Sequence, residues 1–190
     1  MYIVPLNGIL YIEHYRFAGV NMNWYALFVS TGREEYVEKW IHYEFLESEC
    51  TCFTPKRKLI EKKQNQKYQI IRPLFPGYIF INTNMDDNLY YKFINIPKVF
   101  RVLRNGEYYA RVTEDEMNFL HKITGSSNVV DLSQVFIINS KVVVKSGPLT
   151  GLEGIVQRID KRSQRARIVI NFLGSQKVVD LGIEIISMDR

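Results

Sequence analysis

Hydrophobic and polar residues follow two different periods in the first 125 residues. Short apolar runs bounded by turn residues, such as residues 74–81, are typical of strands. In residues 33–46 the apolar positions instead share one side of a helix, and glutamates enrich its first turns. Thr113 and Glu116 have the spacing of a capping box, which predicts the start of another helix. In chain order we expect strands over 24–30, 50–55, 74–81 and 99–103, and helices over 33–46, 86–94 and 113–123.

This order predicts a ferredoxin-like α/β sandwich with one further helix. A segment of different character, residues 56–72, is inserted in it and carries seven basic residues against one acid, Glu61. The polar centre of that segment, residues 63–66, separates two semi-alternating arms. We therefore expect a basic β-hairpin that interrupts the sandwich.

The pattern changes again after the turn residues 125–128. Short strands separated by glycine-containing turns are typical of a small closed barrel, which leaves no exposed edge. The fold class is thus α+β, a ferredoxin-like sandwich followed by a small all-β barrel. The strands expected in the barrel are 141–145, 153–159, 167–172, 177–181 and 184–188. The predicted division is an N-terminal extension over 1–22, a first domain over 23–125, a linker over 126–134 and the barrel over 135–190.

Two hypotheses for the N-terminal extension stay open. Residues 1–21 have no obvious packing partner, and Met22 directly precedes the first predicted strand, so Met22 is a candidate for the native start. The alternative is a genuine extra strand or arm.

Charge separates the two parts of the chain. The formal net charge is +5, and residues 141–190 hold nine Lys/Arg against five Asp/Glu, whereas the remainder holds sixteen against fifteen. A small basic domain favours a polyanionic partner such as nucleic acid.

Other function classes find little support in the sequence. His14, His42 and His121 lie in separate segments without ligand spacing, and two cysteines alone do not make a zinc site, so no metal or cofactor is expected. Cys50 and Cys52 share one strand face, where a disulfide is rare, which favours plain packing in a reduced, cytoplasmic protein. No phosphate loop or nucleophile elbow indicates an enzyme, and no apolar run is long enough to span a membrane.

Two motifs carry a family resemblance. Trp24-Tyr25, then Leu74-Phe75-Pro76-Gly77-Tyr78-Ile79-Phe80, then Ile96-Pro97-Lys98-Val99 resemble the W-Y, F-P-G-Y and V-P-x-V elements of the NusG N-terminal domain. The segment 142–156 is similar to the KOW motif, V-x-V-x-x-G-P-x-x-G-x-x-G-x-V. Together the two matches cover residues 23–190, in the order found in the NusG family, and they imply an SH3-like KOW barrel at the C-terminus.

The resemblance implies bacterial RNA polymerase as the partner. In NusG-type proteins a hydrophobic depression receives the clamp helices of the largest subunit, and here Phe75, Tyr78, Phe80 and Val102 would line it. The contact to the other large subunit maps near Tyr91, although the residues there differ from the threonine-rich motif of the RfaH branch. Spacing alone favours plain core positions for the three aromatic residues, because a central strand is apolar in any case.

The KOW motif has a physical interpretation of its own. Gly147, Gly151 and Gly154 are expected where the barrel turn needs a positive φ or a close backbone approach. The alternative is a tight hairpin of any small barrel.

Basic side chains are candidates for nucleic-acid contact in both domains. The hairpin would face upstream DNA through Lys58, Lys62, Lys63 and Lys67. Arginine forks in the barrel suit phosphate and folded RNA. Solvated surface charge is the alternative for both sets. The barrel candidates are Arg158, Lys161, Arg162, Arg165, Arg167 and Lys177.

The function expected from these features is a monomeric transcription elongation and antitermination factor that resembles LoaP- and RfaH-type specialised members. The loop 172–181 lacks the T-P pair and the phenylalanine with which general NusG contacts the ribosome or Rho. Two alternatives stay open: a general NusG that couples transcription to the ribosome or Rho, and a ribosome-associated RNA-binding protein.

Overall fold

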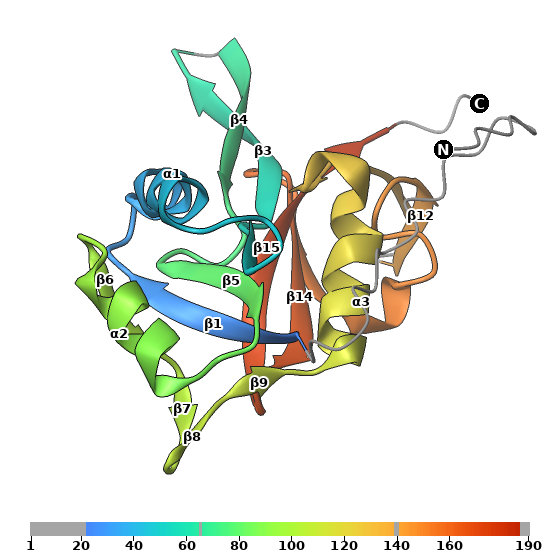
Figure 1. Cartoon of the computed structure of the whole chain (residues 1–190). Helices are drawn as coiled ribbons and strands as arrows, with labels where there is room; N and C mark the ends of the chain where they lie inside the picture. The colour runs from blue at the N-terminus through green and yellow to red at the C-terminus, as the bar shows by residue number, and fades with distance from the viewer. Residues whose placement is uncertain (1–21, 65, 139–140, 187–190) are drawn as a thin grey trace, which may run out of the picture.

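The computed structural model describes residues 22–64, 66–138 and 141–186, and the hypotheses on the N-terminal extension lie outside these residues apart from Met22. A sheet with the order β2-β5-β1-β6, in which β9 also pairs with β1, forms the centre of the first half (Figure 1). Its pairings are antiparallel. The strands are β1 (Asn23–Val29), β2 (Cys50–Phe53), β5 (Tyr78–Thr83), β6 (Val99–Val102) and β9 (Arg111–Val112).

Three helices cover this sheet on its two faces. Helices α1 (Glu34–Glu44) and α2 (Asp87–Asn95) pack on one face, where Leu27, Ile79 and Phe93 are fully buried in a shared core. Helix α3 (Glu114–Thr124) packs on the other face against Ala26 and Phe80. The predicted capping box is present at its start. Helices on both faces of an antiparallel sheet confirm the α+β class.

The basic segment forms the predicted hairpin from β3 (Lys56–Lys63) and β4 (Gln66–Pro73), which projects away from the sheet (Figure 1). Residues predicted as a linker are ordered against it, because β10 (Val129–Val130) follows the 3-10 helix η1 (Gly125–Ser127) and pairs in parallel with β3. A shorter hairpin joins β7 (Arg104–Asn105) and β8 (Tyr108–Tyr109).

The C-terminal part is the predicted small barrel, a five-stranded sheet of order β12-β11-β15-β14-β13. Its core contains Ile168, Phe172 and Leu181. The strands are β11 (Ser133–Ile138), β12 (Lys141–Ser146), β13 (Val156–Asp160), β14 (Arg165–Phe172) and β15 (Ser175–Ile185).

Several predicted boundaries were wrong for physical reasons. β5 begins four residues late, because the Pro76-Gly77 pair forms a turn instead of a strand start. The strand expected over 153–159 opens with the 3-10 helix η2 (Glu153–Ile155). The two last strands are one, β15, and the barrel gains β11, which the sequence analysis missed. Within the described residues, no helix is long and apolar enough to cross a membrane.

Candidate functional site

The predicted aromatic contacts lie on the α3 face of the sheet, under the barrel. Phe80 is fully buried and Phe75 is half-buried. Phe172 from the end of β14 stacks on Phe75, with ring centroids 4.9 Å apart and an interplanar angle of 8°. Phe172 also meets Phe80 edge to face at 5.3 Å. The barrel therefore covers two of the predicted contact residues with its own aromatic ring.

A cavity of about 200 Å³ remains between the sheet and the barrel beside these rings. Phe75, Tyr78 and Phe80 line it from the sheet side. Phe172 and Lys177 line it from the barrel side. An aromatic cavity of this kind at a domain boundary is a typical position for a binding anchor.

The surface formed by Phe75, Tyr78 and Phe80, called the aromatic face below, continues beyond the barrel into solvent. Tyr78 packs on Phe28 at 5.5 Å, and Phe28 packs on Phe100 at the same distance. Phe100 is 60% exposed, and the Arg101 guanidinium lies 5.6 Å from the Phe28 ring centroid. The sequence analysis missed Phe28 and Phe100, although both alternate with residues of the opposite core, a signal that could have placed them on this face.

The turn before Tyr78 is fixed by a buried carboxylate. Gly77 has φ +84°, and a Cβ there would lie 3.1 Å from Thr31 Oγ1 and 3.3 Å from the Val29 carbonyl oxygen. The Gly77 N–H donates to Glu34 Oε1 at 2.7 Å, and Glu34 is buried at the start of α1. Glycine is favoured at such a position, so α1 holds the turn that presents Phe75 and Tyr78.

Two predicted polymerase contacts lie elsewhere. Val102 pairs with Leu27 and is buried in the core beneath α1 and α2, so the prediction that it lines the aromatic depression was wrong. The reason is the strand pleat, which sends Val102 to the face opposite Phe80. Tyr91 lies exposed on α2, the helix that covers that opposite face, and contacts Tyr90. Tyr91 is thus available for a second contact but is separate from the aromatic cavity.

Polar contacts hold the barrel on the sheet domain. Glu116 of α3 accepts from the Thr113 N–H through Oε2, as a capping box requires, and from the Leu173 N–H of the barrel through Oε1 at 2.6 Å. The Arg57 guanidinium of the hairpin donates to the Asp180 carbonyl oxygen of β15.

A glycine allows the hairpin and the barrel to meet closely. A Cβ on Gly182 of β15 would overlap sterically with the Lys58 carbonyl oxygen and with Leu132 Cδ2. Any larger residue would therefore push β15 away from β3.

Only part of the glycine prediction holds in the KOW turn. Gly147 has φ +99°, and a Cβ there would lie 2.7 Å from Ser133 Cα, so it meets both expected requirements. Gly151 has φ +74° in open space. Gly154 has neither a positive φ nor a close neighbour, so the prediction for it was wrong.

The hairpin lysines divide into two groups. Lys58 forms an ion pair with Asp131 at 2.7 Å, which lowers the pKa of that carboxyl, so Lys58 already has a partner within the chain. Lys62 lies directly opposite Lys67 on the exposed ladder. Like charges directly across a strand pair destabilise a sheet, so this pair does not stabilise the hairpin.

The lysines and arginines predicted for nucleic-acid contact in the barrel also divide into residues that have a partner within the chain and residues that are exposed. Arg167 pairs with Asp180 at 2.8 Å, which lowers the Asp180 pKa, and Arg165 is half-buried and donates to the carbonyl oxygens of Ser163 and Gln164. The side chains of the exposed residues Arg158, Lys161 and Arg162 have no ion-pair partner among the residues that the structure describes. Lys177 lies half-buried at the aromatic cavity, so three of the six predicted residues, Arg158 of β13 with Lys161 and Arg162 after it, form the exposed group called the basic turn below.

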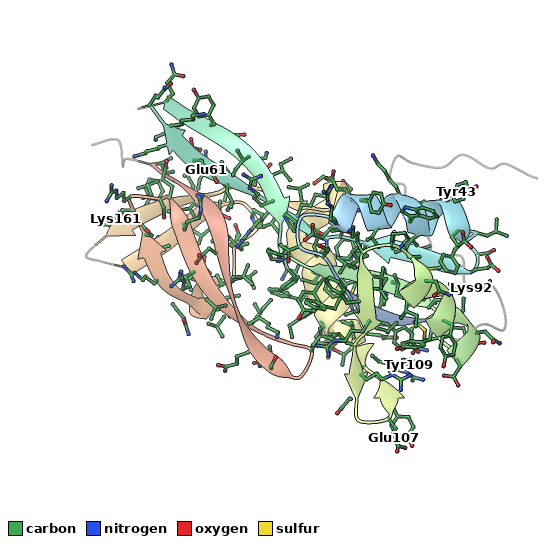
Figure 2. All side chains as sticks on the ribbon, turned by 90° about the vertical axis from the view of Figure 1, so that its left-hand side faces the viewer. Tyr43, Glu61, Lys92, Glu107, Tyr109 and Lys161 are labelled. Carbon is green, nitrogen blue, oxygen red and sulfur yellow. The ribbon has the colours of Figure 1, made fainter. Side chains whose placement is uncertain are left out.

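The hairpin and the basic turn lie near each other in space. Figure 2 shows Glu61 of the hairpin and Lys161 of the β13–β14 turn on the same side of the molecule. Glu61 is close enough to Arg165 to act on the pKa of that guanidinium, although burial is the larger effect and lowers it. Two segments about 100 residues apart in sequence therefore lie on the same side of the molecule.

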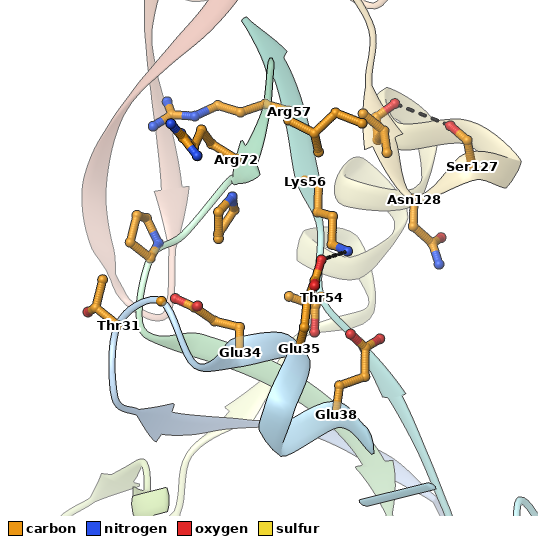
Figure 3. A pocket seen from close by; sticks show the side chains of 15 residues that line it. Thr31, Glu34, Glu35, Glu38, Thr54, Lys56, Arg57, Arg72, Ser127 and Asn128 are labelled. Atoms are coloured by element: carbon orange, nitrogen blue, oxygen red, sulfur yellow. Dashed lines mark hydrogen bonds and ion pairs between the residues drawn. The ribbon is translucent and has the colours of Figure 1, made fainter. Parts of the chain in front are cut away.

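A larger cavity of about 740 Å³ lies between the start of α1, the hairpin base and residues 127–129 (Figure 3). Arg57 and Arg72 lie at one end of it, and an ion pair of 2.7 Å joins Lys56 to Glu35. This ion pair lowers the pKa of Glu35. None of the residues predicted for polymerase or nucleic-acid contact lines this cavity.

The comparisons with known proteins agree with this architecture. Residues 22–121 match the family model described as "Transcription termination factor nusG". The chain belongs to the NusG family.

The relatives carry the same family name. The transcription termination/antitermination protein NusG of Rickettsia prowazekii is 25% identical over 83% of this chain and 85% of its own length. The Helicobacter pylori strain J99 protein of the same name is 23% identical over 84% of this chain and 94% of its own length. A solved structure described as "Domain interaction in Thermotoga maritima NusG" is 22% identical, covers 85% of this chain and 93% of its own, and has a TM-score of 0.49. The chain is thus a transcription elongation factor of this family.

Proposed function

We propose that this chain binds bacterial RNA polymerase through its aromatic face and nucleic acid through its two basic segments, and so promotes transcription through terminators. The observation that carries the proposal is the aromatic face itself. Phe28, Tyr78 and Phe100 continue from the buried rings into solvent, where Phe100 is 60% exposed. Aromatic side chains in such a patch are typical binding hot spots. The clamp helices of the largest polymerase subunit are the proposed partner.

Polymerase binding at this face requires the barrel to move. Phe172 occupies the position above Phe75 and Phe80 that a helical partner would take. We propose that Tyr78 and Phe100 make the first contact and that Phe172 leaves the cavity afterwards. The proposed units are a polymerase-binding domain over 23–125, a connection over 126–134 and a KOW barrel over 135–190.

The basic segments support a polyanion as the second partner. Lys62, Lys63 and Lys67 are exposed on the hairpin, and Arg158, Lys161 and Arg162 are exposed on the barrel. We propose that the hairpin faces DNA and that the barrel binds a leader RNA. Each lost phosphate contact should reduce the salt dependence of binding by about one unit of slope.

The test is single-round transcription by purified bacterial polymerase through an intrinsic terminator, on templates with and without the native leader. Tyr78→Ala should abolish readthrough, because it removes the half-exposed anchor. Tyr43→Ala is the matched control, since Tyr43 is 83% exposed on α1 and outside the aromatic face. Equal readthrough by the wild type and Tyr78→Ala would overturn the polymerase site.

A second pair of variants separates the nucleic-acid contact. Arg158→Gln with Arg162→Gln should reduce leader-dependent readthrough and leave polymerase binding intact. Lys39→Gln with Lys122→Gln is the control, because both lysines are exposed on helices outside the basic segments. Readthrough that is independent of the leader would favour a general NusG, and RNA binding without polymerase binding would favour a ribosome-associated protein.

A further inference from the structure

Three side chains of the metal-ligand type meet on the face of the sheet that α1 and α2 cover, and one of them, Glu38, also lines the larger cavity. Glu38 and His42 are four residues apart on α1 and so share one side of that helix. Cys52 of β2 points to the same region, since Cys50 and Cys52 both face the core beneath α1. Each of Glu38, His42 and Cys52 offers one ligand atom, and these atoms all lie within 4.8 Å of one another.

We propose that Glu38, His42 and Cys52 bind a zinc ion that joins helix α1 to strand β2. Zinc in proteins takes thiolate, imidazole and carboxylate ligands in tetrahedral geometry. This inference is independent of the proposed function in transcription.

The distances fit such an ion. Zinc bonds of about 2.3 Å to sulfur and about 2.0–2.1 Å to nitrogen place the two ligand atoms about 3.5 Å apart at a tetrahedral angle. Cys52 Sγ and His42 Nε2 lie 3.4 Å apart, so this pair already has the required separation. The Glu38 carboxylate comes from one helical turn earlier, and its ligand atom lies within 4.8 Å of the other two.

The surroundings favour a cation between these groups. Glu38 and Cys52 are both half-buried beside the exposed His42. A bound cation stabilises a carboxylate and a thiolate that are partly removed from water. His42 is exposed, which leaves a route for the ion and a position for a water ligand.

The neighbouring thiol sharpens the assignment. Cys50 is buried in the core, and its Sγ donates to the Thr51 carbonyl oxygen at 3.6 Å. Cys50 is outside the cluster, so only one of the two cysteines is assigned to the ion. The sequence analysis excluded a metal site on spacing, because His42 and Cys52 come from different elements and meet only in the fold.

The test is titration of the full chain, stripped of metal by a chelator and kept reduced by a phosphine, with Zn²⁺ in a calorimeter and with Co²⁺ in a spectrophotometer. We expect one Zn²⁺ per chain and a thiolate-to-cobalt charge-transfer band. Cys52→Ser should abolish that band, and Cys52→Ser and His42→Gln should each weaken Zn²⁺ binding by at least about 10–100-fold, the loss seen even for outer-shell partners.

The controls carry the same chemical groups outside the cluster. Cys50→Ser keeps Cys52, and Glu35→Gln removes an exposed carboxylate from the same helix, so both should bind Zn²⁺ as the wild type does. The site would be overturned if the wild type showed no saturable Zn²⁺ binding. It would also be overturned if Cys52→Ser and His42→Gln both bound Zn²⁺ with the affinity of the wild type. Circular dichroism without metal checks each fold, and His42→Gln decides the outcome if a cysteine variant unfolds, because His42 is exposed.

Discussion

The two faces of the central sheet are covered by very different parts of the chain. On one face, α1 and α2 follow the strands that they cover within a few residues, and Leu27, Ile79 and Phe93 are fully buried between them. On the other face, α3 covers one part and Phe172 of the barrel covers another, while Phe100 stays exposed. The helices that cover the first face belong to the sheet domain itself, whereas the barrel supplies part of the cover of the second face.

This difference has consequences for stability and for function. Removal of the helices would expose a whole hydrophobic core, whereas removal of the barrel would expose mainly the aromatic patch around Phe75 and Phe80. Side-chain hydrogen bonds from Arg57 and to Glu116 supplement the ring contacts at that junction. The proposed polymerase binding requires this second cover to separate from the sheet.

The largest expected effect distinguishes two neighbours on β5. Ile79→Ala should lower the free energy of unfolding by about 2–5 kcal/mol, because Ile79 is fully buried under the helices. Tyr78→Ala should lower it by about 1 kcal/mol or less, since Tyr78 is half-exposed on the other face. Urea unfolding of both variants measures the difference, and equal losses would contradict the distinction between the faces.

The next effect concerns the ring that the barrel supplies. Phe172→Ala should lower the free energy of unfolding by about 3 kcal/mol, at the low end for a buried phenylalanine, because under the proposed function the barrel separates instead of leaving a cavity. It should also strengthen polymerase binding and speed proteolysis near residues 131–132. Limited proteolysis and a binding titration measure both, and a variant with the wild-type cleavage rate would argue against a separable cover.

A third variant acts on the junction through the backbone. Gly182→Ala should lower the free energy of unfolding by about 1–3 kcal/mol, because the new Cβ collides with the Lys58 carbonyl oxygen. Gly154→Ala is the control, since Gly154 has an ordinary φ and no heavy atom within 4 Å of an added Cβ. Thermal unfolding compares the two, and a destabilised Gly154→Ala with a normal Gly182→Ala would reverse the interpretation.

The smallest effect depends on pH. The Asp131 pKa is lowered in the folded chain by its hydrogen bond with Lys58, so this pair stabilises the chain above the unfolded pKa of about 3.9 and loses that contribution as the pH falls through the folded pKa. Because Asp131 is largely exposed, the contribution should be below about 1 kcal/mol. Asp131→Asn should therefore show a shallower loss of stability below about pH 4, measured by urea unfolding at several pH values. If the free energy of unfolding fell with pH equally in the variant and the wild type, the Lys58–Asp131 pair would not be the cause of the pH dependence.

The local sequence was sufficient to predict most helices and strands and to identify the family. The capping box at Thr113, the basic hairpin and the barrel turn at Gly147 all depend on residues close together in the chain, where backbone preferences and short hydrogen bonds decide the structure. The same locality explains why the aromatic run 74–81 was found, although the Pro76-Gly77 turn shortened the strand.

Contacts between distant segments were decided only by the tertiary structure. Alternation along a strand gives two faces but does not say which face is which, so Val102 was assigned to the wrong side of the sheet. The sequence also gave no sign that Asp131 would neutralise Lys58 or that Phe172 would stack on Phe75. These pairs form because the packing of whole elements brings their side chains together, and no spacing along the chain encodes that distance.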